Sequence, residues 1–472
     1  MHLQWWSVLP FATMLACIAV LPLVPAAAHL WERRSTQLAI SLVLGLPVAV
    51  WMWVVGGWQV VFHTAVEYGQ FICLLLALFV VSGGIFLSGD IEASPRNNTV
   101  FLAVGAVLAS FVGTTGAAML LIRPLLNTNR ERRYRVHTVV FTILIVANCG
   151  GLLTPLGDPP LFLGFLRGVP FTWTFHLFPE WLFVNAMLLV AYFALDTWFY
   201  SQEPASAVLE DRTEIQPLGL RGASNFLWFT VIIAAVAFAP SVDVHAIEEG
   251  QAGPTDWIPL RELIMLGAAW ASYRTGDKKA RFEDNQFQWG PIAEVATLFI
   301  GIFLTMIPAL HYLDEVAPRL PLNEITFFIF TGGLSSVLDN APTYVTFFEM
   351  AGQLDNPGGA VVAGVPEAYL VPISLGAVFC GAITYIGNGP NFMVKSVADA
   401  AGVQMPTFGG YVGKTFTYLV PVLVSMVCLF IAQPLWAKAL GAVLTVVLLA
   451  NSGRLIARSR RSALADPAPA GD

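Results

Sequence analysis

Long apolar stretches separated by short polar loops make up most of this chain. About 20 consecutive apolar residues are enough for a helix to cross the hydrocarbon core of a bilayer. By that measure we predict about 11 membrane spans, near residues 8–27, 36–55, 69–88, 136–167, 178–200, 224–240, 257–273, 291–309, 367–401, 411–432 and 435–452. The pattern therefore indicates an all-α polytopic membrane protein.

One interruption inside these apolar stretches is the feature around which the others are arranged. The sequence GLLTPLGDPPLF, starting at Gly151, contains helix-breaking Gly and Pro and an Asp that is costly in hydrocarbon. A related sequence, GAITYIGNGPNF, starts 230 residues later at Gly381. Both match G-x-x-T-x-x-G-[D/N]-x-P-x-F. A pair of interrupted membrane helices is typical of secondary transporters built from two repeats.

Composition supports a membrane protein and excludes several other classes. The 472 residues are 56% hydrophobic and 12% charged, whereas a soluble domain is about 25% charged. The five Cys have no spacing typical of a disulfide framework or metal site. We find no phosphate-binding loop, dinucleotide fingerprint or hydrolase motif, so we expect neither an enzyme nor a resident cofactor. Basic residues form no stripe suited to nucleic acid.

The distribution of Lys and Arg predicts the topology. Basic clusters lie at 33–34, 123–135, 274–281 and 454–461, and such clusters favour the cytoplasmic side. All four can be cytoplasmic only if two broken apolar stretches, 98–126 and 321–350, enter the membrane and leave on the same side. We therefore predict two re-entrant hairpins that enter from opposite sides, an inverted-topology repeat, with the N-terminus outside and the C-terminus inside. Ordinary kinked spans are the alternative, but they would leave the arginines of 130–135 outside.

This topology divides the chain into five parts. We predict N-terminal scaffold spans at 1–68, a first repeat at 69–200, a cytoplasmic linker at 201–223, a second repeat at 224–452 and a disordered cytoplasmic tail at 453–472. The first repeat holds hairpin 98–126 and broken helix 136–167. The second holds hairpin 321–350 and broken helix 367–401.

The four breaks supply the candidate binding residues. Irregular backbone at membrane depth is tolerated where it lines a cavity or is buried in protein, and a carboxylate there is able to bind Na⁺ or carry a proton. Helix capping is the alternative role for Asp158, Asn340 and Asn388, since each precedes a Pro. The predicted ion- or substrate-binding residues are Asp158, Asp339, Asn340, Asn388, Thr154, Thr384, Thr114, Thr115, Gly157, Gly387, Asn148 and Asn391, with Na⁺ at Asp158 and Asp339.

Three segments carry a family resemblance: GGLLTPLGDPPLFLGFLRGVPF, GAITYIGNGPNFMVKSVADAAG and SSVLDNAPTY. They resemble the ion-transporter superfamily, and within it the bacterial group labelled as sodium:proton antiporters or citrate transporters. The resemblance covers about residues 70–432. It implies a scaffold and a mobile transport domain, elevator-like motion, a homodimer and a location in the bacterial inner membrane. Superfamily members that carry di- and tricarboxylates have Ser-Asn-Thr at the hairpin tips, whereas this chain has Gly113-Thr114-Thr115 and Asp339-Asn340-Ala341.

Two functions fit these observations. The first is a Na⁺/H⁺ antiporter that works by alternating access, since two candidate carboxylates favour a cation. The second is Na⁺- or H⁺-coupled transport of citrate or a related small carboxylate, favoured by four half-helix N-termini, although neither twelve-residue motif contains an Arg to bind the anion. A channel is a third class, and the paired breaks count against it. The expected partners are therefore Na⁺, H⁺, a small carboxylate in the second case, and the lipid bilayer.

Overall fold

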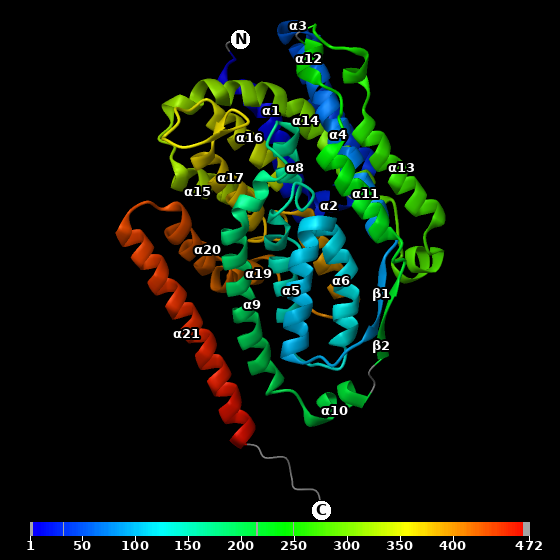
Figure 1. Ribbon diagram of the computed structural model, residues 1–472, viewed down its shortest axis with the longest axis vertical. Helices are drawn as coiled ribbons and strands as arrows, with labels where there is room; N and C mark the ends of the chain where they lie inside the picture. Colours follow the sequence, from blue (N-terminus) through cyan, green and yellow to red (C-terminus); the bar gives the residue numbers. More distant parts are fainter. Residues whose placement is uncertain (1–2, 32, 214–215, 249, 466–472) are drawn as a thin grey trace, which may run out of the picture.

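The chain folds into a bundle of helices with two short β-ribbons (Figure 1). The structure is a computed structural model that describes residues 3–31, 33–213, 216–248 and 250–465. In the described residues, six helical segments are long and apolar enough to cross a membrane: Arg34–Gly56, Trp58–Ser82, Trp173–Tyr200, Gly290–Arg319, Phe408–Ile431 and Leu435–Arg460. The protein is thus a mostly helical multi-pass membrane protein. The total of about 11 spans stays a prediction, because the other apolar helices are shorter.

The helices form two groups that pack chiefly within themselves. The peripheral group contains α1 (Leu9–Val20), α3 (Arg34–Gly56), α4 (Trp58–Ser82), α11 (Asn225–Phe238), α13 (Leu260–Thr275) and α14 (Gly290–Val316). The hairpin group contains α5 (Pro95–Val112), α6 (Thr114–Thr128), α7 (Val136–Phe141), α8 (Pro159–Leu166), α9 (Phe178–Tyr200), α15 (Glu324–Ser335), α16 (Asn340–Gly352), α17 (Glu367–Cys380), α18 (Gly389–Ala400), α19 (Phe408–Tyr418), α20 (Val420–Met426) and α21 (Leu435–Ala465). The candidate site lies inside the hairpin group, against α4 and α14 of the peripheral group.

Helices α5 and α6 form the first hairpin and lie side by side (Figure 1). Ser94 caps α5 by accepting a hydrogen bond from the Asn97 N–H at 3.3 Å. The chain reverses at Gly113, whose φ of 83° suits glycine. At 1.5 Å per residue, α5 and α6 are about 27 and 22 Å long, so neither covers the roughly 30 Å of hydrocarbon.

Helices α15 and α16 form the second hairpin. The loops that enter α15 and leave α16 lie at the end of the molecule opposite to those of the first hairpin (Figure 1). Asn323 begins α15 with a capping box, since its side chain accepts from Thr326 N–H while the Thr326 hydroxyl accepts from Asn323 N–H. Asp339 caps α16. Helices of 12 and 13 residues reach only about 18 to 20 Å. These lengths suit hairpins that turn inside the membrane.

Both predicted broken helices are interrupted where the sequence motifs lie. The first runs from α7 through a π-helical turn (Thr142–Val146) and a 3₁₀ turn (Cys149–Leu152) to α8. The second stops at Cys380, the end of α17, and resumes at Gly389, the start of α18. Pro159 and Pro390 lie in the first turns of α8 and α18, where the missing N–H costs no helical hydrogen bond.

Several predicted boundaries were wrong. The span predicted at 69–88 is α4, which begins at Trp58 because Gly57 turns the chain with a φ of 86°. Beyond it, β1 (Phe86–Asp90) pairs antiparallel with β2 (Gln216–Arg221) of the predicted linker, which also holds helix α10 (Ala205–Thr213). A second ribbon pairs β3 (Val361–Val362) with β4 (Val365–Pro366). The linker is therefore folded against the first half.

The predicted disordered tail is helical in its described part. Helix α21 continues past the apolar stretch to Ala465, and residues 466–472 lie outside the described residues. Ala, Leu and Arg are good helix formers, so they extend a helix that the apolar stretch has already started. The Ser459 hydroxyl donates to the Thr197 carbonyl at 3.0 Å, which holds this extension against α9.

Candidate ion-binding site

The Asp158 carboxylate lies where the two hairpin tips and the two broken helices meet. From the first hairpin tip, the Thr114 hydroxyl donates to Asp158 Oδ1 at 2.9 Å. From the second hairpin, Asn340 Nδ2 donates to Asp158 Oδ2 at 2.5 Å. From the second break, Asn388 Nδ2 donates to Asp158 Oδ1 at 3.1 Å. Residues from three other segments, up to 230 positions from Asp158 in the sequence, therefore converge on its buried carboxyl group.

Capping does not explain Asp158 or Asn388. Each occupies the N-cap position of its helix with an extended backbone, yet neither side chain caps a backbone N–H. For α8 the reason is chemical, because Pro160 has no N–H to offer and the Leu161 N–H already donates to the Asp158 main-chain carbonyl at 3.1 Å. The Asp158 side chain is instead turned toward the other half of the protein.

The two predicted carboxylates differ in their surroundings. Asp158 is 1% exposed, whereas Asp339 is half-buried. Asp339 Oδ1 accepts from the Ala341 N–H at 3.0 Å, which makes it the N-cap of α16. Asp339 itself, and not Asn340, therefore has the capping role at the second tip. Asn340 is the first residue of α16 and is free to reach Asp158.

A chain of amides continues from Asp158 into the second break. Asn388 Nδ2 also donates to Asn148 Oδ1 at 3.1 Å, and Asn148 Nδ2 donates to Asn391 Oδ1 at 2.6 Å. Asn391 Nδ2 in turn donates to the Thr384 carbonyl at 2.9 Å. All three Asn side chains are buried. They satisfy the polar groups of both breaks and fix the orientation of Asn388 toward Asp158.

One buried oxygen at this site has no partner. Asn340 Oδ1 is buried and, in the part of the chain that the structure describes, makes no hydrogen bond. Its orientation follows from chemistry, since Asn340 Nδ2 must face the carboxylate oxygen that accepts from it. A buried acceptor without a donor is costly. A bound cation beside Asp158 would satisfy it.

The remaining predicted residues line the cavity or belong to what we call the frame, the close contacts that hold each broken helix together and against its hairpin. The Thr154 and Thr384 hydroxyls donate to the carbonyls of Ser110 and Ser336, one hairpin each. Gly157 and Gly387 pack so closely that an added Cβ would lie 2.1 Å from the Gly151 carbonyl oxygen and 2.6 Å from that of Gly381, respectively. Thr115 lines the cavity beside Asp158. The structure thus brings together Asp158, Asn340, Asn388, Thr114, Asn148 and Asn391, and gives Thr154, Thr384, Gly157 and Gly387 contacts within the frame.

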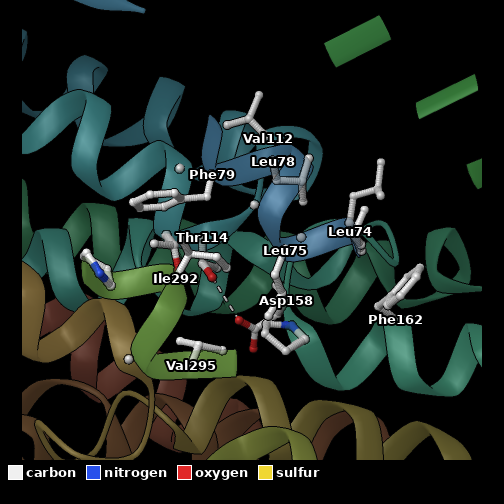
Figure 2. Close-up of a pocket in the computed structure, with 18 of the residues that line it drawn as sticks. Leu74, Leu75, Leu78, Phe79, Val112, Thr114, Asp158, Phe162, Ile292 and Val295 are labelled. Carbon is white, nitrogen blue, oxygen red and sulfur yellow. Dashed lines mark hydrogen bonds between the residues drawn. The ribbon is translucent and has the colours of Figure 1, made fainter. Parts of the chain in front are cut away.

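A small cavity of 110 Å³ adjoins Asp158, and Figure 2 shows its apolar wall. Leu74, Leu75, Leu78 and Phe79 come from α4, and Ile292 and Val295 from α14. Among the described residues lining it, none is Lys, Arg or His. An anion in this cavity would therefore meet no cationic side chain.

Two further cavities follow this one, each sharing lining residues with the one before it. A cavity of 170 Å³ shares Phe79, Thr115 and Met393 with the first and also reaches Arg123. A third, of 610 Å³, shares Arg123 with the second and is also lined by Arg130 and Arg135. Together they lead from Asp158 toward the end of the molecule that carries the arginines of 130–135. We call this end the basic end.

An ion-pair cluster that the sequence analysis did not single out lies at the other end of α8. Arg167 Nη1 lies 2.7 Å from Glu67 Oε1, and Arg167 Nη2 donates to Glu67 Oε2 at 3.1 Å. Arg167 Nε also donates to Glu349 Oε1 at 2.8 Å. Glu67 was missed because the predicted span began two residues after it. A charged residue so close to an apolar stretch is the signal that could have identified it.

Comparison with known proteins identifies the family. The family described as "Putative citrate transport" matches residues 1–431. The chain belongs to this family. It is also similar to an uncharacterized transporter of Mycobacterium tuberculosis, with 23% identity over 364 residues, 71% of this chain and 79% of the relative. A 46 kDa membrane protein of Mycobacterium leprae is 23% identical over 375 residues, 73% of this chain and 81% of the relative. The protein is therefore a member of a membrane transporter family.

Proposed function

We propose that this protein is a secondary active transporter that exchanges Na⁺ for H⁺ at Asp158. The observation that supports it is the position of this one buried carboxylate. The two hairpin tips and the second break each donate a hydrogen bond to it. Beside it lies the unpartnered oxygen of Asn340. Carboxylate, amide and hydroxyl oxygens are the ligands that hard cations prefer.

Exchange follows from the cost of burying a charge. An ionised carboxylate in an apolar site is unfavourable unless a proton or a cation neutralises it. Asp158 would therefore carry either H⁺ or Na⁺ as it moves between the two sides of the membrane, and the two would compete. Thr114 Oγ1 lies 2.9 Å from Asp158 Oδ1, and the Asn340 amide contacts Oδ2. Thr114 Oγ1 and Asn340 Oδ1 would complete the coordination of Na⁺, with water reaching the site through the cavities.

Alternating access requires that the site face each side in turn. The paired hairpins and broken helices favour an inverted-topology repeat. In such a repeat the two halves can exchange conformations, which closes the site to one side of the membrane and opens it to the other. The positive-inside rule assigns the basic end to the cytoplasm. The cavities that lead there from Asp158 then correspond to an inward-facing state. The hairpin group would be the part that moves, against the peripheral group as scaffold.

Cation-coupled transport of citrate or a related carboxylate is the second candidate. The description of the family favours it. So does the 610 Å³ cavity at the basic end, because Arg123, Arg130 and Arg135 line it and arginines bind carboxylates well. In this case Asp158 would bind the coupling cation, and the anion would enter through the arginine-lined cavity.

Proteoliposomes that enclose a pH-sensitive dye separate the two candidates. For exchange, an inward Na⁺ gradient should make the interior alkaline without any organic substrate, and Asp158→Asn should abolish the signal. Asp339→Asn is the matched control, because an Asn can still cap α16. If the dye responds only when citrate is present, and radiolabelled citrate accumulates in step with it, citrate transport replaces antiport. No response in either arm would contradict both.

A further inference from the structure

We propose that Arg167 is a gate that holds the hairpin group against the peripheral group at the end opposite the basic end. Arg167 ends helix α8, which begins at the candidate site. Its partner Glu67 lies on α4 of the peripheral group. The inference rests on the proposed function only in requiring that the two groups move relative to each other.

The contacts of Arg167 are suited to a clamp. Within the hairpin group, Arg167 Nε donates to Glu349 Oε1 at 2.8 Å, which orients the guanidinium. Nη2 donates to Glu67 Oε2 at 3.1 Å, and Nη1, which donates to the Leu163 carbonyl, lies 2.7 Å from Glu67 Oε1 as a second ionic contact. A charge-assisted hydrogen bond reinforced by a close ionic contact is stronger than a neutral hydrogen bond. Glu349 therefore positions the guanidinium, and Glu67 is the partner that a sliding motion would remove.

The clamp lies between two cavities. On one side is the 110 Å³ cavity beside Asp158, lined by Phe162 of α8. On the other is a cavity of 500 Å³ lined by Leu166 of α8, by Arg167 directly after it and by Glu67. The C-terminal part of α8, with the clamp at its end, thus separates the cavity beside Asp158 from the opposite side of the protein.

Because the clamp is buried, its strength should depend on which conformation the protein adopts. The side chains of Arg167 and Glu67 are 10% and 8% exposed, so their attraction acts with little water between them. When the hairpin group shifts, the two charges would separate and become hydrated in the widened cavity. The contact therefore stabilises the state open to the basic end, and losing it should raise the population of the opposite state.

Thiol labelling of Met393→Cys measures this population. Met393 lines the route between Asp158 and the basic end. The half-exposed native Cys17, Cys73 and Cys428 are first replaced by Ser. A background control has the same replacements but keeps Met393, and it measures any labelling of the buried Cys149 and Cys380. In right-side-out vesicles, a membrane-impermeant maleimide should label this position slowly from outside and quickly when it is admitted to the inside.

Glu67→Gln and Arg167→Lys should each raise the rate of labelling from outside by about tenfold or more, because both remove the two-point ionic contact. Asp399→Asn is the matched control, since the Lys395–Asp399 ion pair joins two residues of the hairpin group and does not link it to the peripheral group. It should leave the rate unchanged. The two variants keep the test open if either fails to fold, as judged by gel filtration. An unchanged outside rate in a folded variant would overturn the gate. Because labelling requires no transport, it tests the gate even if the assays for Na⁺ and citrate transport fail.

Discussion

The two broken helices have nearly the same frame but carry different chemistry at its centre. In each half, a threonine hydroxyl of the motif donates to a serine carbonyl of the hairpin: Thr154 to Ser110 and Thr384 to Ser336. In each half, a glycine packs closely against the carbonyl six residues before it. At the next position the first half has Asp158 and the second has Asn388, and the second donates to the first.

For the proposed function, this difference would leave a single carboxylate between two similar hydrogen-bonding arrangements. In this frame the first residues of two half-helices lie close together, and the side chains at these positions would determine what binds there. With an amide in one half, the carboxylate of the other gains a hydrogen-bond donor instead of a second negative charge. One carboxylate can be neutralised by one proton or one Na⁺ at a time, which is the requirement for exchange.

Asp158→Asn should have the largest effect on transport. The amide cannot bind a proton or supply the negative charge for Na⁺, so Na⁺-driven alkalinisation should fall at least about a hundredfold, by more than 2.7 kcal/mol of lost stabilisation. The measurement is the initial rate of the dye signal in proteoliposomes, with Asp339→Asn reconstituted at the same density. If Asp158→Asn kept a tenth of the rate while Asp339→Asn lost it, the central carboxylate would be Asp339.

Asn388→Asp tests whether the asymmetry is required. It places a second carboxylate about 3 Å from the first, and two such groups cannot both be ionised. The pair would share a proton, so Na⁺ exchange at neutral pH should fall roughly tenfold. Combined with Asp158→Asn, the same substitution should recover more activity than Asp158→Asn alone, because the carboxylate has only changed halves. Absence of any recovery would indicate that the two positions are not equivalent.

The sequence was sufficient to predict the breaks and most of the residues around Asp158. Gly and Pro in an apolar stretch have few interpretations, and the repeated motif located both breaks. What it could not predict was which of two neighbouring residues reaches the centre. Asp339 and Asn340 are neighbours, and only the start of α16 at Asn340 shows that the first caps the helix while the second reaches Asp158.

The Arg167 clamp shows a different limit. Its three residues are far apart in sequence, and each lies near the end of an apolar stretch where a charge reaching the interface is the ordinary interpretation. Only packing of α4, α8 and α16 brings Glu67, Arg167 and Glu349 together. Helix α4 begins at Trp58, directly after the turn at Gly57, which places Glu67 well inside a helix, whereas hydropathy placed the start of this span at residue 69.

Substitutions at the two hairpin tips should have effects of intermediate size. Asn340→Ala removes a donor to Asp158 and the unpartnered oxygen proposed to bind Na⁺, so the apparent Km for Na⁺ should rise about ten- to thirtyfold, or about 1.4 to 2 kcal/mol. Thr114→Val removes one hydroxyl and should raise it about fivefold. Initial rates over a range of Na⁺ concentrations measure both. A larger effect at Thr114 than at Asn340 would place the cation on the side of the first tip.

The smallest effect should come from the frame itself, and it should be the same in both halves. Thr154→Val and Thr384→Val each remove one buried hydroxyl that donates to a hairpin carbonyl. The same hydroxyls accept long hydrogen bonds of 3.2 Å from backbone N–H groups of the breaks, from Leu156 in the first half and from Ile386 and Gly387 in the second. We expect a loss of about 1 kcal/mol and a few °C in Tm from each substitution. Thermal unfolding of the purified variants measures it, with Thr230→Val as the control because the exposed Thr230 hydroxyl bonds only the Phe226 carbonyl of its own helix. If the two halves are copies of one frame, the two losses should agree within about 0.5 kcal/mol. A Tm lowered in one half only would mean that the matching hydrogen bonds conceal unequal packing, and that the asymmetry extends beyond Asp158 and Asn388.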